Sequence, residues 1–200
     1  MGTEHGLRRL VNFSDAVVAI AITLLILPLV DSASSSGQGG LAPFVDHHGT
    51  QFFAFALSFA VIGSFWWGQH QMIEHVTGYN RLLVAGIFLW ILSIVFLPFP
   101  TELLSSARNG GQGVHALYVG TLFLAAVGVL LQQWAIVRAP ELQAEGHRDG
   151  ADLSAAVILS VLMAVIFLLV IVLPTIGLWA LLLLLLSRPL EKLSHNRRRR

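Results

Sequence analysis

The chain has 200 residues, of which 56% are hydrophobic and only 12% are charged. Its mean hydropathy of +0.76 excludes an ordinary soluble enzyme, a disordered chain and a fibrous repeat, because so short a chain has too few polar side chains to cover its apolar surface. The net charge of +1 argues against a nucleic-acid partner, and the absence of cysteine excludes disulfides, thiolate metal sites and cysteine nucleophiles. A polytopic membrane protein remains.

Apolar segments recur along the whole chain, and a helix that spans a bilayer needs about 20 mostly apolar residues. A proline break ends the third segment, and only Pro174 and a few small residues separate the last two, which predicts a tight helical hairpin. We predict an all-α membrane protein with six transmembrane helices, built as a single transmembrane domain over residues 1–200. The predicted spans are Leu10–Val30, Gln51–His70, Leu82–Leu97, His115–Val137, Leu153–Leu173 and Thr175–Ser187.

The distribution of lysine and arginine predicts the orientation. With six spans, eleven of the 12 basic residues lie on one side of the membrane, and only Arg108 lies on the other. Basic loops stay in the cytoplasm, so both termini are predicted to be cytoplasmic. The first span is expected to be retained rather than cleaved as a signal peptide, because its apolar run is long and contains Asp15. The Ser/Gly/Gln-rich segment Asp31–Gly40 is predicted to be a flexible external connection.

Ionisable side chains inside the predicted spans are few and lie near the cytoplasmic ends of the first two helices. Arg9 and Asp15 fall on different faces of the first helix, so each needs a partner from another helix. On the second helix, Trp67, His70 and Glu74 share one face. A polar network between the two helices would satisfy these groups, and a structural role for it is favoured over catalysis.

A second pattern runs along the first helix on one narrow sector. If this sector lined a pore, its aliphatic residues would stack as apolar rings, and Asp31 would place a negative ring at the outer mouth. The stripe alone is equally typical of a lipid-facing helix, and Pro28 can shift its phase beyond Leu24. Its residues are Phe13, Ala16, Ile20, Leu24, Leu27 and Asp31, with Thr23 at the edge.

Residues Arg9–Asp15, with the sequence RLVNFSD, resemble the RxxxFSD signature that opens the first helix of the transmembrane protein 175 family of potassium channels. The similarity continues through Ala16–Pro28. Trp67–His70 (WGQH) is similar to the family's W-x-x-H, and Leu97–Thr101 (LPFPT) is similar to its proline-phenylalanine break after the third helix. The resemblance covers the first half of the chain closely and rests on helix count in the second half.

The resemblance implies a homotetramer in which the first helix of each subunit surrounds a central pore. It places the constriction and selectivity region at rings of Ile20, Leu24 and Leu27, with a polar surface from Thr23. Geometry also requires an oligomer, because one chain with a single pore-lining helix cannot enclose a pore. No glycine-rich TVGYG filter occurs in the sequence. The residues that the resemblance assigns to anchoring the pore helix are Arg9, Phe13, Ser14, Asp15, Trp67 and His70.

We therefore expect a potassium-preferring cation channel in a bacterial or archaeal cell membrane, with permeant potassium and no cofactor or resident metal. Potassium gives up water more readily than sodium, so an apolar constriction predicts a modest preference. The alternative is a proton-permeable channel or a proton-linked transporter that uses Asp15, His70 and Glu74, although we find no inverted repeat.

An intramembrane enzyme is not expected, since the sequence contains neither an HExxH nor a GxSxG pattern. The run Asp46, His47 and His48 is the one hint of a metal site. Because adjacent residues lack the one-face spacing of a helical metal site, we expect these side chains to be solvated in an external loop.

Overall fold

A computed structural model describes residues 2–35, 40–106, 112–144, 161 and 165, and every regular element among them is a helix. The predicted fifth and sixth spans, Leu153–Leu173 and Thr175–Ser187, lie outside the described residues apart from two single positions. The elements in chain order are α1 (Glu4–Leu24), α2 (Leu27–Ser35), α3 (Leu41–Ile73), α4 (Arg81–Phe96), α5 (Pro98–Ser106), α6 (Gln112–Arg138) and a short 3-10 helix, η1 (Pro140–Leu142).

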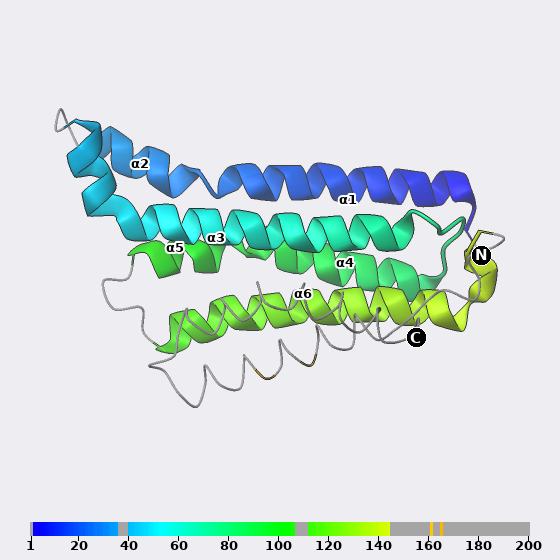
Figure 1. The fold of residues 1–200 in the computed structure, drawn as a ribbon. Helices are drawn as coiled ribbons and strands as arrows, with labels where there is room; N and C mark the ends of the chain where they lie inside the picture. Colours follow the sequence, from blue (N-terminus) through cyan, green and yellow to red (C-terminus); the bar gives the residue numbers. More distant parts are fainter. Residues whose placement is uncertain (1, 36–39, 107–111, 145–160, 162–164, 166–200) are drawn as a thin grey trace, which may run out of the picture.

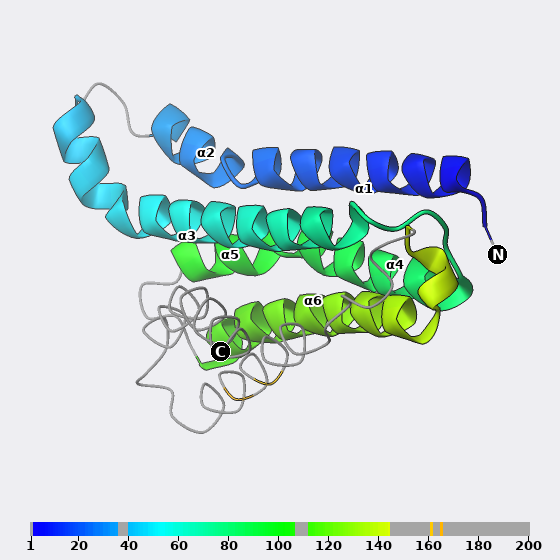
Figure 2. The ribbon, with the colours of Figure 1, turned by 45° about the vertical axis from the view of Figure 1, so that its right-hand side comes forward.

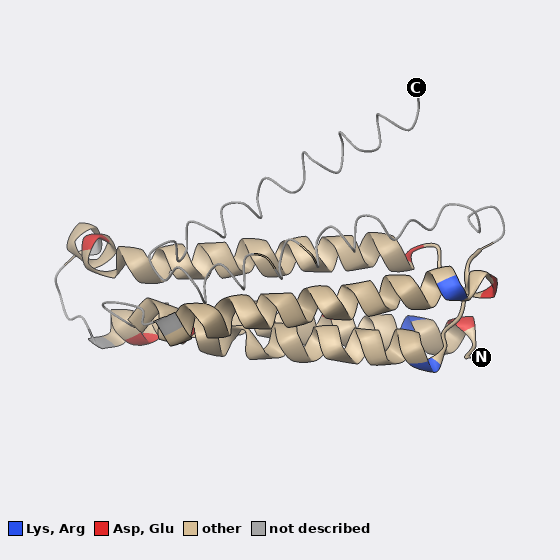
Figure 3. Cartoon of the chain, turned by 90° about the horizontal axis from the view of Figure 1, so that it is seen from below, with Lys and Arg blue, Asp and Glu red and all other residues tan. Residues whose placement is uncertain are grey.

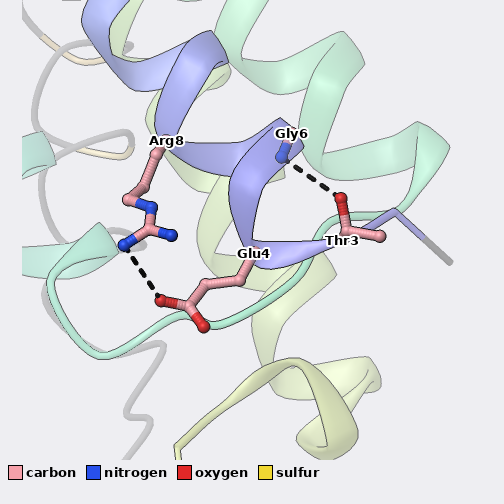
Figure 4. Close-up of polar contacts among 4 residues, drawn as sticks. All are labelled: Thr3, Glu4, Gly6 and Arg8. Atoms are coloured by element: carbon pink, nitrogen blue, oxygen red, sulfur yellow. Dashed lines mark hydrogen bonds and ion pairs between the residues drawn. The ribbon is translucent and has the colours of Figure 1, made fainter.

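The first predicted span is two helices rather than one. Thr3 caps α1 by accepting a hydrogen bond from the Gly6 amide at 3.3 Å (Figure 4), which satisfies one of the free amides of the first turn. Pro28 has no amide hydrogen, so the α-helical ladder is interrupted and α1 ends at Leu24. A short turn joins it to α2, and that helix continues through Ser35. The prediction of a flexible connection from Asp31 is therefore wrong for residues 31–35.

Helix α3 begins ten residues before the predicted span at Gln51 and is kinked at His48, where the backbone leaves helical geometry at φ −111° and ψ 17°. The turns before this kink lie at an angle to the rest of α3 (Figures 1 and 2). Asp46 and His47 belong to these turns, so the prediction that they lie in an external loop is wrong. The segment is helical, and both side chains are exposed.

Helices α4 and α6 make the closest packing of the described bundle. Asn80 caps α4 by accepting a hydrogen bond from the Leu83 amide at 2.8 Å, and the helix ends just before Pro98, as predicted. Two glycines let the backbones approach. A Cβ on Gly86 would lie 2.9 Å from the backbone nitrogen of Gln132, and a Cβ on Gly128 would lie 2.8 Å from the backbone nitrogen of Trp90. The core of the protomer therefore centres on this helix pair.

Four helical stretches in the described residues are long and apolar enough to cross a membrane, and they correspond to the first four predicted spans. The long helices lie side by side along one axis, with the start of α1 and the end of α6 at the same end (Figures 1 and 2). Arginines among the described residues, namely Arg8, Arg9, Arg81 and Arg138, lie at that end (Figure 3). We call it the arginine end; acidic residues of α2, α3 and α5 lie at the opposite end.

Candidate functional site

Helix α1 has one face that packs inside the protomer and one that does not. The buried face carries Leu7, Ser14, Val18 and Ala21, and Leu25 continues it into the turn. The opposite face is exposed from the arginine end to the break before α2. It includes every residue of the stripe that the sequence singled out, namely Phe13, Ala16, Ile20, Leu24, Leu27 and Asp31, together with Thr23.

The three aliphatic residues of the stripe are exposed, as is Leu92 on α4. Ile20 is 60% exposed, Leu27 is 49% exposed and Leu24 is 40% exposed. A large aliphatic side chain in such a position gains its stabilisation only from lipid, from another chain or from a narrow pore wall. Within the described residues, α1 therefore has an apolar face that its own protomer does not cover.

Thr23 lies beside this stripe and is tied to the backbone of Ile20. Its hydroxyl donates a hydrogen bond to the Ile20 carbonyl at 2.8 Å, and the side chain is exposed. A hydroxyl that donates its one hydrogen still has oxygen lone pairs to offer. The exposed face of α1 thus carries an oxygen acceptor one turn from Ile20.

The helix break lies directly beyond Thr23. The amide of Leu25 bonds to the Ile22 carbonyl at 3.3 Å and that of Ile26 bonds to Thr23 at 3.4 Å, so the last turn of α1 is tightened to 3-10 geometry. Because Pro28 has no amide hydrogen, the Leu24 carbonyl lacks its usual donor. Asp31 follows in α2 and is exposed. The stripe therefore continues across a break between two helices.

The opposite side of α1 is tied to α3 through a tryptophan. The indole nitrogen of Trp66 donates a hydrogen bond to Asp15 Oδ1 at 2.8 Å. Ser14 is fully buried and its hydroxyl donates to the Val11 carbonyl at 2.7 Å. At the edge of the exposed face, the ring of Phe13 is half exposed and lies 6.3 Å from that of Phe88 on α4. The FSD segment thus contacts both neighbouring helices.

The predicted partners Trp67 and His70 are placed differently from Trp66. Both are exposed, and His70 stacks on the Trp66 ring at 5.5 Å and on the Trp67 ring at 6.2 Å. Arg9 is also exposed and makes no hydrogen bond or ion pair with another residue in the described part of the chain. Within the protomer, the contact to Asp15 comes from Trp66, which the sequence pattern did not single out.

A buried polar cluster that the sequence did not reveal joins α3, α5 and α6. The Ser58 hydroxyl lies 2.9 Å from Thr101 Oγ1 and 3.1 Å from the Tyr118 hydroxyl, and all three side chains are buried. Thr101 also donates to the Leu97 carbonyl at 2.8 Å. Three hydroxyl groups satisfy one another in an apolar core, so the cluster fixes α5 after the Pro98 break.

None of the described residues forms a cluster of three or more His, Asp or Glu side chains that could hold a metal ion. His47 and His48 are neighbours, with rings 5.9 Å apart, but His48 Nδ1 lies 3.0 Å from the Phe44 carbonyl. A ring nitrogen facing a carbonyl oxygen must carry its proton, so this nitrogen does not face outward as a ligand.

These features define a helical membrane protein whose first helix is fixed by one face and keeps an uncovered apolar face. The sequence profile of a family described as endosomal/lysosomal potassium channel TMEM175 matches residues 9–98. A protein named potassium channel from Streptomyces collinus is 32% identical over 137 residues, which cover 67% of this chain and 66% of that protein. The rat endosomal/lysosomal proton channel TMEM175 is 33% identical over 96 residues, covering 44% of this chain and 19% of that protein.

The fold agrees with these sequence matches. The crystal structure of a lysosomal potassium-selective channel TMEM175 homolog from Chamaesiphon minutus superposes with a TM-score of 0.73 at 22% identity, covering 92% of this chain and 96% of that one. The chain matches the TMEM175 family over residues 9–98, and its fold is that of the solved homolog. It spans just under two thirds of the length of the bacterial relatives that it matches.

Proposed function

We propose that this chain forms a potassium-preferring cation channel in the cell membrane. The bacterial relatives that it matches are named potassium channels. The observation that carries the proposal is the exposed apolar face of α1, which the protomer leaves uncovered while the opposite face packs against the bundle. The whole assembly that we propose has six spans per chain, cytoplasmic termini, and four chains with α1 around a central pore.

In this assembly, Ile20 forms the constriction. Four isoleucine side chains facing one another give an apolar ring that offers a cation no substitute for its water shell, and such a ring can gate by dewetting. An ion that passes is partly dehydrated, and potassium gives up water at a lower free-energy cost than sodium. Leu24 and Leu27 continue the apolar path, and the Thr23 hydroxyl oxygen gives a passing ion a polar contact beside the narrowest point.

The other predicted residues hold this face toward the pore. A helix turns by about 100° per residue, so a small rotation of α1 would replace Ile20 in the pore by a neighbouring side chain. The bond between Trp66 and Asp15 and the burial of Ser14 oppose that rotation. Arg9, His70 and Trp67 remain exposed on the protomer, so we propose that they complete the anchoring between subunits.

Asp31 contributes to the outer mouth in this arrangement. It is exposed on α2, beyond the helix break and at the end of the bundle opposite the arginines. Four such carboxylates around the pore axis would raise the local cation concentration by electrostatic attraction.

Replacing Ile20 tests the assignment of the constriction. In liposomes with a potassium gradient, we expect the purified chain to conduct potassium better than sodium. Ile20→Asn wets and widens the ring, so we expect higher flux and a reversal potential that no longer separates the two ions. Leu92→Asn is the matched control, because Leu92 on α4 is 62% exposed and gives the same chemical change away from α1. Equal reversal potentials for wild type and Ile20→Asn would show that Ile20 is not the constriction.

Proton permeation is the second candidate, because the eukaryotic relatives are named proton channels. Asp15, His70 and Glu74 are the ionisable groups of α1 and α3 that it would use. The same liposomes, loaded with a pH-sensitive dye, measure it separately. Proton flux without potassium flux would replace the potassium proposal, and its loss in Asp15→Asn would assign it to this group.

A further inference from the structure

Three segments that are far apart in the sequence are joined at the arginine end by backbone hydrogen bonds. The Gly2 amide donates to the Tyr79 carbonyl at 2.9 Å, the Thr77 amide to Leu142 at 2.7 Å, and the Ala144 amide to His75 at 3.0 Å. Gly2 and Tyr79 form one isolated antiparallel bridge, and residues 76 and 143 form another. We call residues 2–6, 74–80 and 139–144 together the basal clasp. It connects the start of α1, the loop from α3 to α4 and the end of α6.

The ring of Tyr79 lies directly over the first turn of α1. A Cβ built on Gly6 would lie 2.8 Å from the Tyr79 hydroxyl oxygen and 2.8 Å from a ring carbon, and one built on Gly2 would overlap the ring. Thr3 caps the same turn through the Gly6 amide, and Glu4 pairs with Arg8 on its outer side at 3.6 Å (Figure 4). The two glycines therefore allow a contact from which a larger residue would displace the Tyr79 ring.

The clasp holds α1 at one end, and the bond between Trp66 and Asp15 holds it further along. Beyond Asp15 the helix continues to Ile20 and ends at the break before Pro28. Asp15 lies nine residues from Gly6 and five from Ile20. With Asp15 as a pivot, a lateral shift of about 1 Å at Gly6 moves Ile20 by about 0.5 Å in the opposite sense, because the rise per residue is constant.

We propose that Tyr79 and Gly6 are positioning residues for the pore, through a contact that sets the tilt of α1 and hence the width of the Ile20 ring. The inference rests on the proposed function, in which α1 lines the pore. The free energy of wetting an apolar ring falls steeply as the ring widens. The average flux through a fluctuating ring is therefore dominated by its wider states. Loosening the clasp broadens the distribution of tilts, so it raises the flux per channel.

Gly6→Ala tests this contact against a matched glycine. Gly68 is also within a helix, but a Cβ there meets nothing within 4 Å, so Gly68→Ala gives the same gain in helix propensity without the clash. We expect Gly6→Ala to raise potassium flux per assembled channel by about fivefold, which is the low end of typical coupling between two sites. We expect Gly68→Ala to match wild type.

Tyr79→Ala removes the ring instead of adding an atom. It therefore tests the same contact even if Gly6→Ala does not assemble into channels. It should raise the flux to the same extent. Tyr79→Phe keeps the ring over Gly6 and should match wild type. In the Tyr79→Ala background, adding Gly6→Ala should have no further effect, since the two residues act through one contact. A role in stability alone would leave flux per assembled channel unchanged in all of these variants.

Amide hydrogen exchange of residues 74–80 reports on the clasp independently of conduction. We expect faster exchange in Gly6→Ala and Tyr79→Ala than in wild type and Gly68→Ala. Faster exchange with wild-type flux per channel would overturn the positioning role, and unchanged exchange in Gly6→Ala would contradict the contact itself. If wild-type liposomes carry no potassium, the proposed function fails, whereas the exchange pattern still decides whether the clasp exists.

Discussion

Helices α1 and α4 are both strongly apolar, but they bury different shares of their residues within the chain. The helical segment Arg81–Ser106, which begins with α4, has 44% of its most apolar stretch buried within the chain. The corresponding share is 28% for Glu4–Ser34, which begins with α1. Ile87 and Trp90 on α4 are fully buried, and Gly86 lets the backbones of α4 and α6 meet. Ile20, near the end of α1, is largely exposed.

The difference separates a scaffold from the surface that we propose to be functional. A membrane helix gains no hydrophobic free energy by leaving lipid for another helix, so α4 and α6 are held together by close packing of small residues. Helix α1 is held by a narrow strip that includes Ser14 and Asp15, which leaves its other face uncovered by the described residues. Mutations on the two helices should therefore affect different properties of the protein.

The largest effect is expected at the α4–α6 contact. Gly128→Val places a branched side chain against the Trp90 backbone, where a Cβ alone would lie 2.8 Å from the nitrogen. Overpacking of this kind typically costs about 1–3 kcal/mol, and more where backbone must move. We expect a lower yield of folded protein and a lower midpoint of thermal unfolding in detergent.

Gly68→Val is the control for this change, because the same branched side chain enters an α-helix at a position with open space. Its thermal midpoint should stay close to that of wild type. Equal loss in the two variants would show that helix propensity, not the α4–α6 contact, causes the destabilisation, and the contrast between scaffold and functional surface would lose its basis.

The described part of the scaffold is largely predictable from the sequence because its signals are local. Pro98 is a helix break that can be seen in the sequence, and the observed bounds of α4 lie within a residue of the predicted span. The start of α3 was missed, because residues 41–50 mix apolar, acidic, histidine and proline residues without a hydrophobic run. These residues are the first turns of α3, which continues past the kink at His48.

The candidate site was only partly predictable, because some of its contacts depend on how distant segments pack against one another. Helical pitch is a local property, so the stripe of Ile20 and Leu24 falls on one exposed face as expected. The choice between Trp66 and Trp67 depends on how α3 is rotated against α1, which the sequence of either helix does not encode alone. The approach of Tyr79 to Gly6 likewise depends on two segments that are distant in the chain.

An intermediate effect is expected where α1 is tied to α3. Trp66→Phe removes the indole donor and leaves the half-buried Asp15 carboxylate without its partner, which costs less than the roughly 1–3 kcal/mol of a fully buried polar group. Asp15→Ala removes the carboxylate itself. We expect both variants to reduce the thermal midpoint and the yield of tetramer on size-exclusion chromatography.

Channels of these two variants that still assemble should keep the wild-type preference for potassium, because Ile20 and Leu24 are unchanged and the buried face of α1 keeps its packing. Trp134→Phe is the control, because Trp134 lies on α6, is exposed and packs against Arg138 rather than Asp15. An intact Asp15→Ala tetramer with altered reversal potentials would show that the anchoring residues belong to the selectivity region, and the two faces of α1 would no longer have separate roles.

The smallest effect is expected at the outer mouth, where charge acts through solvent. Asp31→Asn keeps the shape of an exposed side chain on α2 and removes its charge. With the Debye length at about 30 Å in 0.01 M salt and about 3 Å in 1 M salt, a ring of carboxylates attracts cations only in the dilute solution. We expect single-channel conductance to fall by about twofold at low salt and to equal wild type at high salt, as electrostatic steering requires.

Asp46→Asn removes a second exposed charge at the same end of the bundle but on the kinked start of α3, and it should change conductance less. If Asp31→Asn and Asp46→Asn behave alike, the effect is one of general surface charge, and the functional face of α1 ends at the helix break before Pro28.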